Sequence, residues 1–136
     1  MLSLAEFTGC WSLSREIADR LGGSGRFDGA AVFSPSPDGL LYEEEGSLTL
    51  ARGGAFAAQR SYDWRDEGGT VAVHFADGAF FHRFALSERP EAAHFCAPDQ
   101  YDVAYDFSAW PDWTSRWTVR GPRKDYEMTS RYRRAD

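Results

Sequence analysis

One segment of the chain sets a charged side chain among aromatic ones, an arrangement that suits a binding site. Residues 56–64 alternate in character, and Arg60 falls on the face that carries Tyr62 and Trp64. A guanidinium can bind both oxygens of a carboxylate at once, and burying it without a partner is costly. Arg60 therefore predicts an internal carboxylate, supplied either by this protein or by a ligand.

Glu44 is the internal carboxylate that the sequence itself offers to Arg60. Alternation along residues 40–50 places Glu44 on the same face as Tyr42, and the segment of Glu44 directly precedes that of Arg60. Two interpretations of Arg60 stay open from the residues alone. One is an ion pair with Glu44, and the other is a bond to the headgroup of a ligand.

Histidine and tyrosine side chains extend this predicted polar interior. His82 shares a face with Phe80 and Phe84, which leaves Phe81 and Arg83 on the other face. A mostly apolar wall with a few polar groups is typical of small-molecule sites. We therefore expect ligand-binding roles for eight residues, namely Glu44, Arg60, Tyr62, His82, Tyr101, Tyr105, Trp117 and Tyr126.

The use of tyrosine in place of aliphatic residues predicts a cavity. The chain has a single Ile, whereas a core built only for stability favours Leu, Ile and Val, because each buried polar group needs a partner. We expect space for several waters or a small ligand. At least three of a set of polar residues should line it: Tyr42, Glu44, Arg60, Tyr62, His82, Tyr101, Tyr105 and Tyr126.

Other reactive residues do not form a recognisable catalytic or metal site. His74 is expected on the exterior, and His94 and Cys96 point alike on one strand instead of meeting as a nucleophile pair. Cys10 and Cys96 are expected as buried, reduced thiols. Gly121–Lys124 lacks the spacing of a phosphate-binding loop and predicts a tight turn. We expect no metal and no cofactor.

The composition indicates one globular domain over residues 1–136, large enough for a core without disulfide or metal staples. The formal net charge of -6 argues against a nucleic-acid partner. Basic residues concentrate between 116 and 134, but acidic residues interrupt them, so we interpret them mainly as a charged exterior. No signal peptide and no apolar membrane span are visible, which predicts a cytoplasmic protein without a membrane partner. A homodimer stays open.

Turn signals divide the chain into ten extended segments. Gly, Pro and Asp recur between them, and Asp77-Gly78 is the strongest hairpin signal. Only Leu13–Leu21 shows weak helix character. The expected segments are residues 7–20, 26–33, 40–50, 55–65, 70–75, 79–86, 92–97, 100–107, 114–120 and 124–134.

These segments predict an all-β fold, a single antiparallel up-and-down β-barrel of about 8–10 strands with little helix. Closure is expected because it removes exposed sheet edges. The bend at Trp110–Trp113 is expected to plug one barrel end. A flattened barrel filled by its own side chains stays as the alternative to a container.

Gly9-Cys10-Trp11 resembles the Gly-x-Trp element of the lipocalin and calycin barrels. In those families the Trp closes one barrel end and an Arg of the last strand lies across its ring, which is a favourable cation–π contact. The resemblance implies the same structural role for Trp11. It offers Arg131, Arg133 and Arg134 as partners of the ring.

The chain as a whole also resembles a family of small bacterial proteins with a lipocalin-like fold and no assigned function. The similar elements are Phe7-x-Gly-x-Trp11, His94-x-Cys96-x-x-Asp99-x-Tyr101, and Trp117-x-Val-x-Gly-Pro-x-Lys-Asp-Tyr126 with Tyr132-Arg-Arg134. This resemblance implies the fold and leaves the chemistry open.

Three functions follow as hypotheses. The first is non-enzymatic binding of a small amphipathic or aromatic molecule, such as a carboxylate, against Arg60 and tyrosine hydroxyls. The second is a cofactor-free lyase or isomerase acting on a phenolic or unsaturated acid, with Glu44 or His82 as proton donor. The third is a protein-interaction module with a filled barrel. Fold alone does not choose among them.

Overall fold

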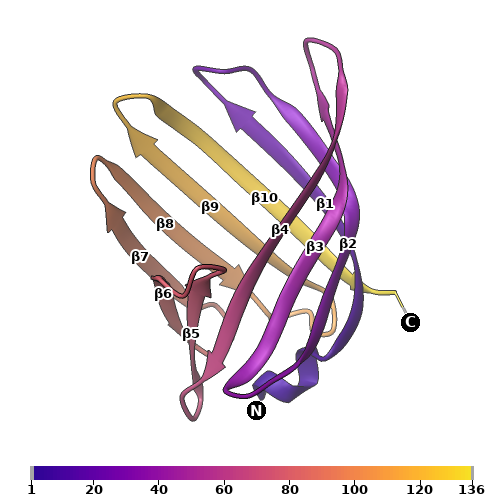
Figure 1. Ribbon diagram of the computed structural model, residues 1–136, viewed down its shortest axis with the longest axis vertical. Coiled ribbons are helices and arrows are strands. Elements are labelled where there is room, and N and C mark those ends of the chain that lie inside the picture. The colour runs from indigo at the N-terminus through magenta and orange to yellow at the C-terminus, as the bar shows by residue number, and fades with distance from the viewer. Residues whose placement is uncertain (1, 136) are drawn as a thin grey trace.

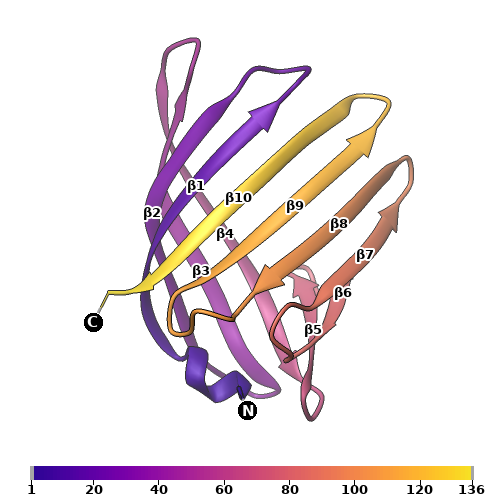
Figure 2. The same ribbon diagram turned by 180° about the vertical axis from the view of Figure 1, so that it is seen from behind.

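The protein is an antiparallel up-and-down β-barrel of ten strands, seen in a computed structural model that describes residues 2–135 (Figures 1 and 2). The strands are β1 (Gly9–Asp19), β2 (Gly25–Ser36), β3 (Gly39–Leu50), β4 (Ala55–Asp66), β5 (Thr70–Phe75), β6 (Phe80–Ala85), β7 (Glu91–Cys96), β8 (Asp99–Asp106), β9 (Trp113–Gly121) and β10 (Lys124–Arg134). Their hydrogen-bonded order runs β6-β5-β4-β3-β2-β1-β10-β9-β8-β7. The predicted all-β barrel is confirmed.

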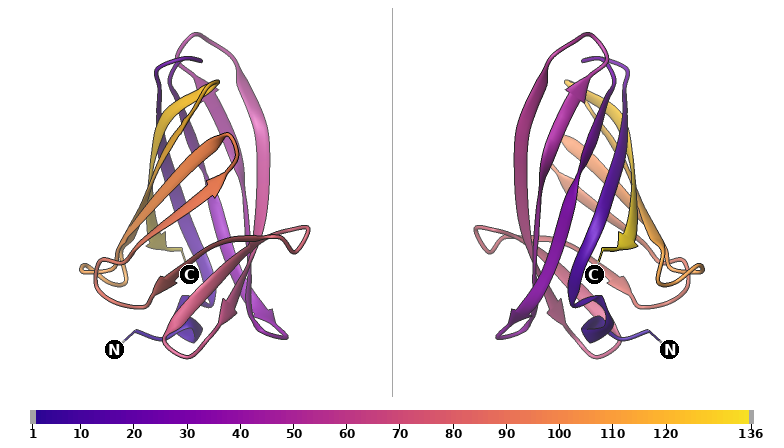
Figure 3. Two further views of the ribbon diagram at one scale, coloured as in Figure 1. Left: turned by 90° about the vertical axis from the view of Figure 1, so that its left-hand side faces the viewer. Right: turned by 90° about the vertical axis from the view of Figure 1, so that its right-hand side faces the viewer.

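The barrel wall is incomplete where its two edge strands meet. β6 and β7 stand at the ends of the hydrogen-bonded order. β5 pairs with β4 only along Tyr62–Asp66, so residues 55–61 of β4 have no strand on that side. In Figure 3 the short β5 and β6 occupy only the lower part of this wall. One half of the barrel is therefore enclosed and the other half is an open cup.

The weak helix character of Leu13–Leu21 does not produce a helix, in agreement with the extended segment expected over residues 7–20. Residues 13–19 lie in β1, where side chains alternate between the interior and the solvent. The helical residues are Leu4–Phe7, a single 3-10 turn (η1) in which the Ser3 backbone N–H donates to the Glu6 carboxylate. This capping pattern was the missed signal, since it lies before the first alternating residue. Among residues 2–135, no helix is long and apolar enough to cross a bilayer.

Aromatic side chains plug the enclosed end of the barrel. η1 inserts Phe7, whose ring centroid lies 4.7 Å from that of Trp110 and 5.5 Å from that of Trp113. Trp11 is fully buried, and its indole N–H donates to the Phe7 carbonyl at 2.8 Å. The predicted burial of Trp11 and the plug at Trp110–Trp113 are thus confirmed.

The arginine across the Trp11 ring is Arg134, whose guanidinium carbon lies 4.1 Å from the ring centroid. Arg134 is the register partner of Trp11 in the β1–β10 pair. The prediction that Arg131 or Arg133 lies over the Trp11 ring is wrong. They fall on the exterior, 3.8 Å from Glu16 and 3.9 Å from Asp112 respectively. The same two-residue alternation that brings Arg134 to the ring turns Arg133 outward.

A β-bulge reverses the predicted inward and outward orientation of two side chains in β6. Pairing between β5 and β6 shifts at Val73/His74, so that Val73 opposes His82 while His74 opposes Phe80. Phe81 is consequently fully buried, whereas Phe80 is 41% exposed. The prediction that Phe80 faces inward and Phe81 outward is therefore wrong, because a bulge reverses the count of alternating faces.

A pair of glycines allows β2 and β3 to approach closely. Gly29 and Gly46 are register partners. A Cβ on Gly29 would collide with the Glu45 carbonyl, and one on Gly46 with the Asp28 carbonyl. No larger residue fits at this crossing.

Replacing Trp11 with Ala should lower the free energy of unfolding by about 3–5 kcal/mol, the range for deleting a core aromatic. Urea unfolding measures the change. The matched control is Arg133→Ala on the exterior, where a surface substitution costs about 0.5 kcal/mol or less. A Trp11→Ala loss no larger than that of the control would contradict the structural role of the indole.

Candidate functional site

A buried ion pair lies at mid-height in the barrel, and one of its members is Arg15. Arg15 donates to Glu44 through both terminal nitrogens, at 2.7 and 2.9 Å, and through Nε to Ser130 Oγ at 2.7 Å. The Tyr42 hydroxyl donates to Glu44 at 2.5 Å and lies 2.8 Å from the Tyr132 hydroxyl. Side chains from β1, β3 and β10 are thus joined across the interior.

This network holds Glu44 ionised. Burial alone would raise the pKa of the Glu44 carboxyl, but the hydrogen bonds and charge of Arg15 outweigh it, so the pKa lies below its ordinary value. Burial would lower the pKa of Arg15, and the bond to Glu44 reverses that effect. The pKa of the Tyr42 hydroxyl is raised, chiefly by burial. The two charges cancel inside the barrel.

The predicted ion pair between Glu44 and Arg60 is wrong. The two residues are register partners in β3 and β4, but Glu44 turns to Arg15 instead. Arg60 donates to the Tyr62 hydroxyl at 3.3 Å and lies 6.0 Å from the Trp117 ring centroid. No carboxylate of residues 2–135 lies within 4.0 Å of its guanidinium.

A small cavity lies beside this network, with about 30 Å³ of space for water. Such a space admits about two water molecules. Six of the eight polar residues expected to line a cavity do so, although the space is smaller than expected. Its wall consists of Arg15, Tyr42, Glu44, Arg60, Tyr62, Trp64, Val73, Phe81, His82, Tyr105, Trp113, Ser115, Trp117 and Tyr132.

His82 presents a neutral imidazole to the cavity wall. The residue is 1% exposed, and its Nε2 lies 2.7 Å from the Tyr105 hydroxyl. Burial, with a smaller effect of His94, lowers the pKa of His82 to about 3. Its Nδ1 has no hydrogen-bond partner among residues 2–135. An unpartnered buried polar atom next to a cavity is an available bonding site for a water or a ligand.

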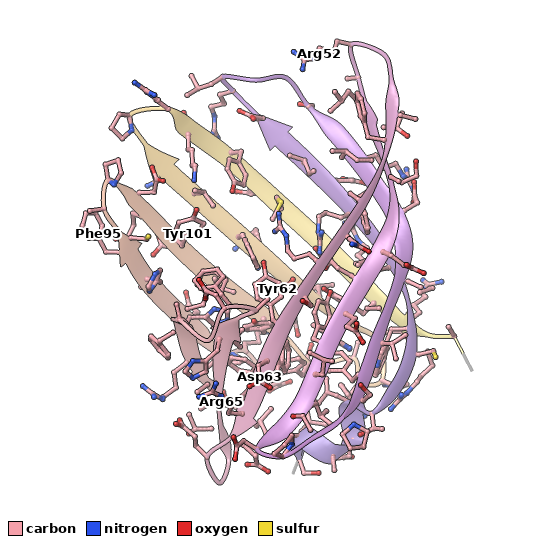
Figure 4. The ribbon with its side chains drawn as sticks, in the orientation of Figure 1. Arg52, Tyr62, Asp63, Arg65, Phe95 and Tyr101 are labelled. Atoms are coloured by element: carbon pink, nitrogen blue, oxygen red, sulfur yellow. The ribbon has the colours of Figure 1, made fainter. Side chains whose placement is uncertain are left out.

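Three predicted site residues lie nearer the open half. Trp117 lines the cavity, with its ring centroid 6.3 Å from that of Tyr62. Tyr101 and Tyr126 are half-buried and lie outside the cavity wall. The Tyr101 hydroxyl accepts a bond from Lys124 at 3.1 Å. Figure 4 shows Tyr62 and Tyr101 on two separate strands of the wall, β4 and β8.

The predicted burial of the two cysteines is wrong. Cys10 and Cys96 are free thiols, and both are exposed rather than buried. Both fall outside the packed core, at positions near a strand end or in a short edge strand. Among residues 2–135, no cluster of three or more His, Cys, Asp or Glu side chains could hold a metal ion.

Arg15 is the site residue that the sequence analysis missed. Trp11, Leu13 and Arg15 occupy every second position of β1, so their side chains share one face of the strand. That alternation was the available signal. Residues 7–20 were expected to be extended, but their two faces were not assigned, so Arg15 was not placed in the interior.

Fold and interior together define an up-and-down barrel with polar groups set into an aromatic wall. The chain belongs to the DUF6314 family, a family of unknown function, whose model matches residues 7–134. No curated protein matches the sequence.

Two solved structures align with the chain. The S-type phycobiliprotein lyase CPES from Guillardia theta aligns with a TM-score of 0.69 and 10% identity, over 99% of this chain and 94% of the lyase chain. A de novo designed fluorescence-activating β-barrel aligns with a TM-score of 0.42 and 15% identity, over 98% of this chain and 99% of the designed chain. At such identity the likeness to the lyase concerns the fold alone.

Glu44→Gln should destabilise the protein by about 3–5 kcal/mol, because it leaves Arg15 buried without a counter-charge. The double variant Arg15→Met/Glu44→Leu should recover most of that loss. Urea unfolding gives the comparison, with Glu43→Gln at the neighbouring exposed position as the matched control. Equal, small effects of Glu43→Gln and Glu44→Gln would show that the pair is not held as described.

Buried His82 should make the fold sensitive to acid. Its pKa is about 3 in the folded chain against 6.5 for the free side chain, so the unfolded state takes up the proton first. Stability should therefore fall as pH drops from about 6.5 towards 3, by about 2 kcal/mol at pH 5. His82→Gln should remove this part of the loss between pH 7 and 5. His74→Gln, which leaves His82 in place, should retain it.

Proposed function

We propose that the barrel binds a small amphipathic molecule whose carboxylate is held by Arg60. Its aromatic or other apolar part would lie against Tyr62 and Trp117, at the boundary between the enclosed half and the open cup. His82 and the cavity wall would meet the inner end of the molecule with neutral hydrogen-bonding groups. In this proposal Tyr101, Tyr105 and Tyr126 supply further hydroxyls along the wall.

The unused hydrogen-bond donors of Arg60 are the observation that supports this proposal. A guanidinium has five N–H donors, and Arg60 uses one for a single long bond to Tyr62. Arg15 is buried and is engaged by Glu44 and Ser130, whereas the Arg60 side chain is exposed at the boundary with the open cup. Arg60 is therefore an available charge beside an aromatic wall, and a carboxylate matches its forked geometry.

The protonation states favour binding over the acid-catalysed alternative. A lyase or isomerase of the kind considered needs a proton donor near neutral pH. Glu44 has a lowered pKa and stays ionised, while the pKa of His82, about 3, leaves it neutral. The similar fold of a phycobiliprotein lyase keeps an enzymatic role open, but fold does not determine chemistry.

The open half of the barrel also argues against a fully filled interaction module. Residues of β4 near its start, including Phe56 at 55% exposure, are not covered by β5. An interior filled for stability alone would bury such a ring. A container needs this accessible part of the wall.

Arg60→Met should weaken binding of aromatic carboxylates about tenfold to a hundredfold, since a hydrogen bond to a charged group contributes about 1.5–3 kcal/mol. Affinity can be measured by displacement of the fluorescent probe anilinonaphthalene sulfonate. A panel of aromatic and unsaturated carboxylates would be compared with the corresponding amides. Binding of the amides should change little in the variant.

The matched control is Arg65→Met on the same strand, because Arg65 faces outward and pairs with Asp63 at 2.9 Å (Figure 4). Carboxylate affinity should be unchanged in this control. Equal affinity of the wild type for acids and amides, or no binding of any member of the panel, would refute the proposal. Native mass spectrometry of the purified protein would identify a ligand that remains bound.

A further inference from the structure

The two ends of the barrel carry opposite charge. Five loops connect the strands on the side of the open end, and with one flanking residue on each side they span residues 19–25, 50–55, 75–80, 96–99 and 121–124. They hold four basic and three acidic residues. The four loops at the closed end, counted in the same way as residues 36–39, 66–70, 85–91 and 106–113, hold one basic and seven acidic residues. The loops of the open end therefore carry a small positive excess, whereas those of the closed end are strongly negative.

Two arginines of this rim are not neutralised. Arg20 pairs with Asp125 at 2.7 Å, and Lys124 pairs with Asp99 at 3.0 Å. Arg52 and Arg123 have no carboxylate within 4.0 Å among residues 2–135. Figure 4 shows Arg52 at the tip of the β3–β4 loop, the part of the molecule that projects furthest at this end.

The same rim carries exposed apolar side chains. Leu21 in the β1–β2 loop is 61% exposed, Phe56 next to the β3–β4 loop is 55% exposed, and Phe95 next to the β7–β8 hairpin is 65% exposed. They make up three of the five large hydrophobic side chains exposed among residues 2–135. Exposed apolar residues scattered over a surface need no explanation, but these three share one end with the free arginines.

We propose that the open rim docks on an anionic membrane surface. Leu21, Phe56 and Phe95 would enter the interface between headgroups and acyl chains, while Arg52 and Arg123 would contact anionic headgroups. The negative closed end would orient the barrel with its mouth towards the bilayer. Docking on a surface requires no spanning segment, so the absence of an apolar span from the sequence does not weigh against it.

The arrangement of the rim favours a bilayer over a protein partner. A stable protein interface has a contiguous apolar centre surrounded by polar residues. Here the apolar side chains stand singly, with Leu21 in a loop and Phe56 and Phe95 near the ends of two strands. Separate insertions of this kind suit a fluid interface, and the positive charge suits anionic lipid.

Co-sedimentation of the purified protein with vesicles tests the proposal. Binding is expected to phosphatidylcholine vesicles that contain phosphatidylserine, and not to phosphatidylcholine alone, and it should decrease in high salt. Arg52→Glu/Arg123→Glu should weaken binding at least tenfold, since each surface cation near anionic lipid contributes about a fivefold factor. Leu21→Ser should weaken it several-fold through loss of apolar insertion.

Two controls make the outcome specific. Arg89→Glu reverses one charge at the closed end and should leave vesicle binding unchanged, and circular dichroism should show native folds for all variants. No binding to anionic vesicles, or equal losses in Arg89→Glu and the rim variant, overturns the proposal. So does concentration-dependent dimerisation that disappears in the rim variant, because the rim would then contact a second copy. Carboxylate binding is tested with Arg60→Met and vesicle binding with the rim variants, so the two proposals fail separately.

Discussion

The bidentate pair between Arg15 and Glu44 is the constraint on which the rest of the barrel depends. Its charges lie inside an aromatic wall, where either one alone would be strongly destabilising. Satisfying them requires β1 and β3 to keep their registers, since a one-residue slip would turn Arg15 or Glu44 outward. Ser130 and Tyr132 bring β10 into the same network. The polar centre therefore specifies how three strands align, a role that apolar packing alone performs less selectively.

The Arg15–Glu44 network also separates two halves of the barrel, one packed and one open to solvent. Below it, Phe7, Trp11 and Trp113 belong to a closed aromatic core. Above it, the short β5 leaves residues 55–61 of β4 without a neighbour, and the wall opens to solvent. Burial in the lower half supplies the stability that allows the upper half to expose Arg60 and Phe56. A fully filled barrel would gain more hydrophobic stabilisation, but it would leave no room for a ligand.

Period-two alternation predicted much of the fold and part of the candidate site. It placed Glu44 and Tyr105 inward correctly, because long regular strands preserve the count of faces. It failed at Phe81, where a bulge shifts the count, and a bulge has no sequence signal strong enough to locate it. It also paired Glu44 with the wrong arginine. Adjacent strands suggested Arg60, whereas the choice of Arg15 depends on interior geometry that only the closed barrel creates.

The sign of the interior charge follows from these contacts. Arg15 and Glu44 cancel, and burial keeps His82 neutral, so Arg60 is the cation that would attract the proposed ligand. The rim above it is also positive, although the chain as a whole carries -6. A uniformly negative protein would repel an anion before it reached Arg60, and the segregation of acidic residues to the closed end removes that barrier from the approach. The same distribution that would orient the barrel on an anionic surface would therefore also admit an anionic ligand.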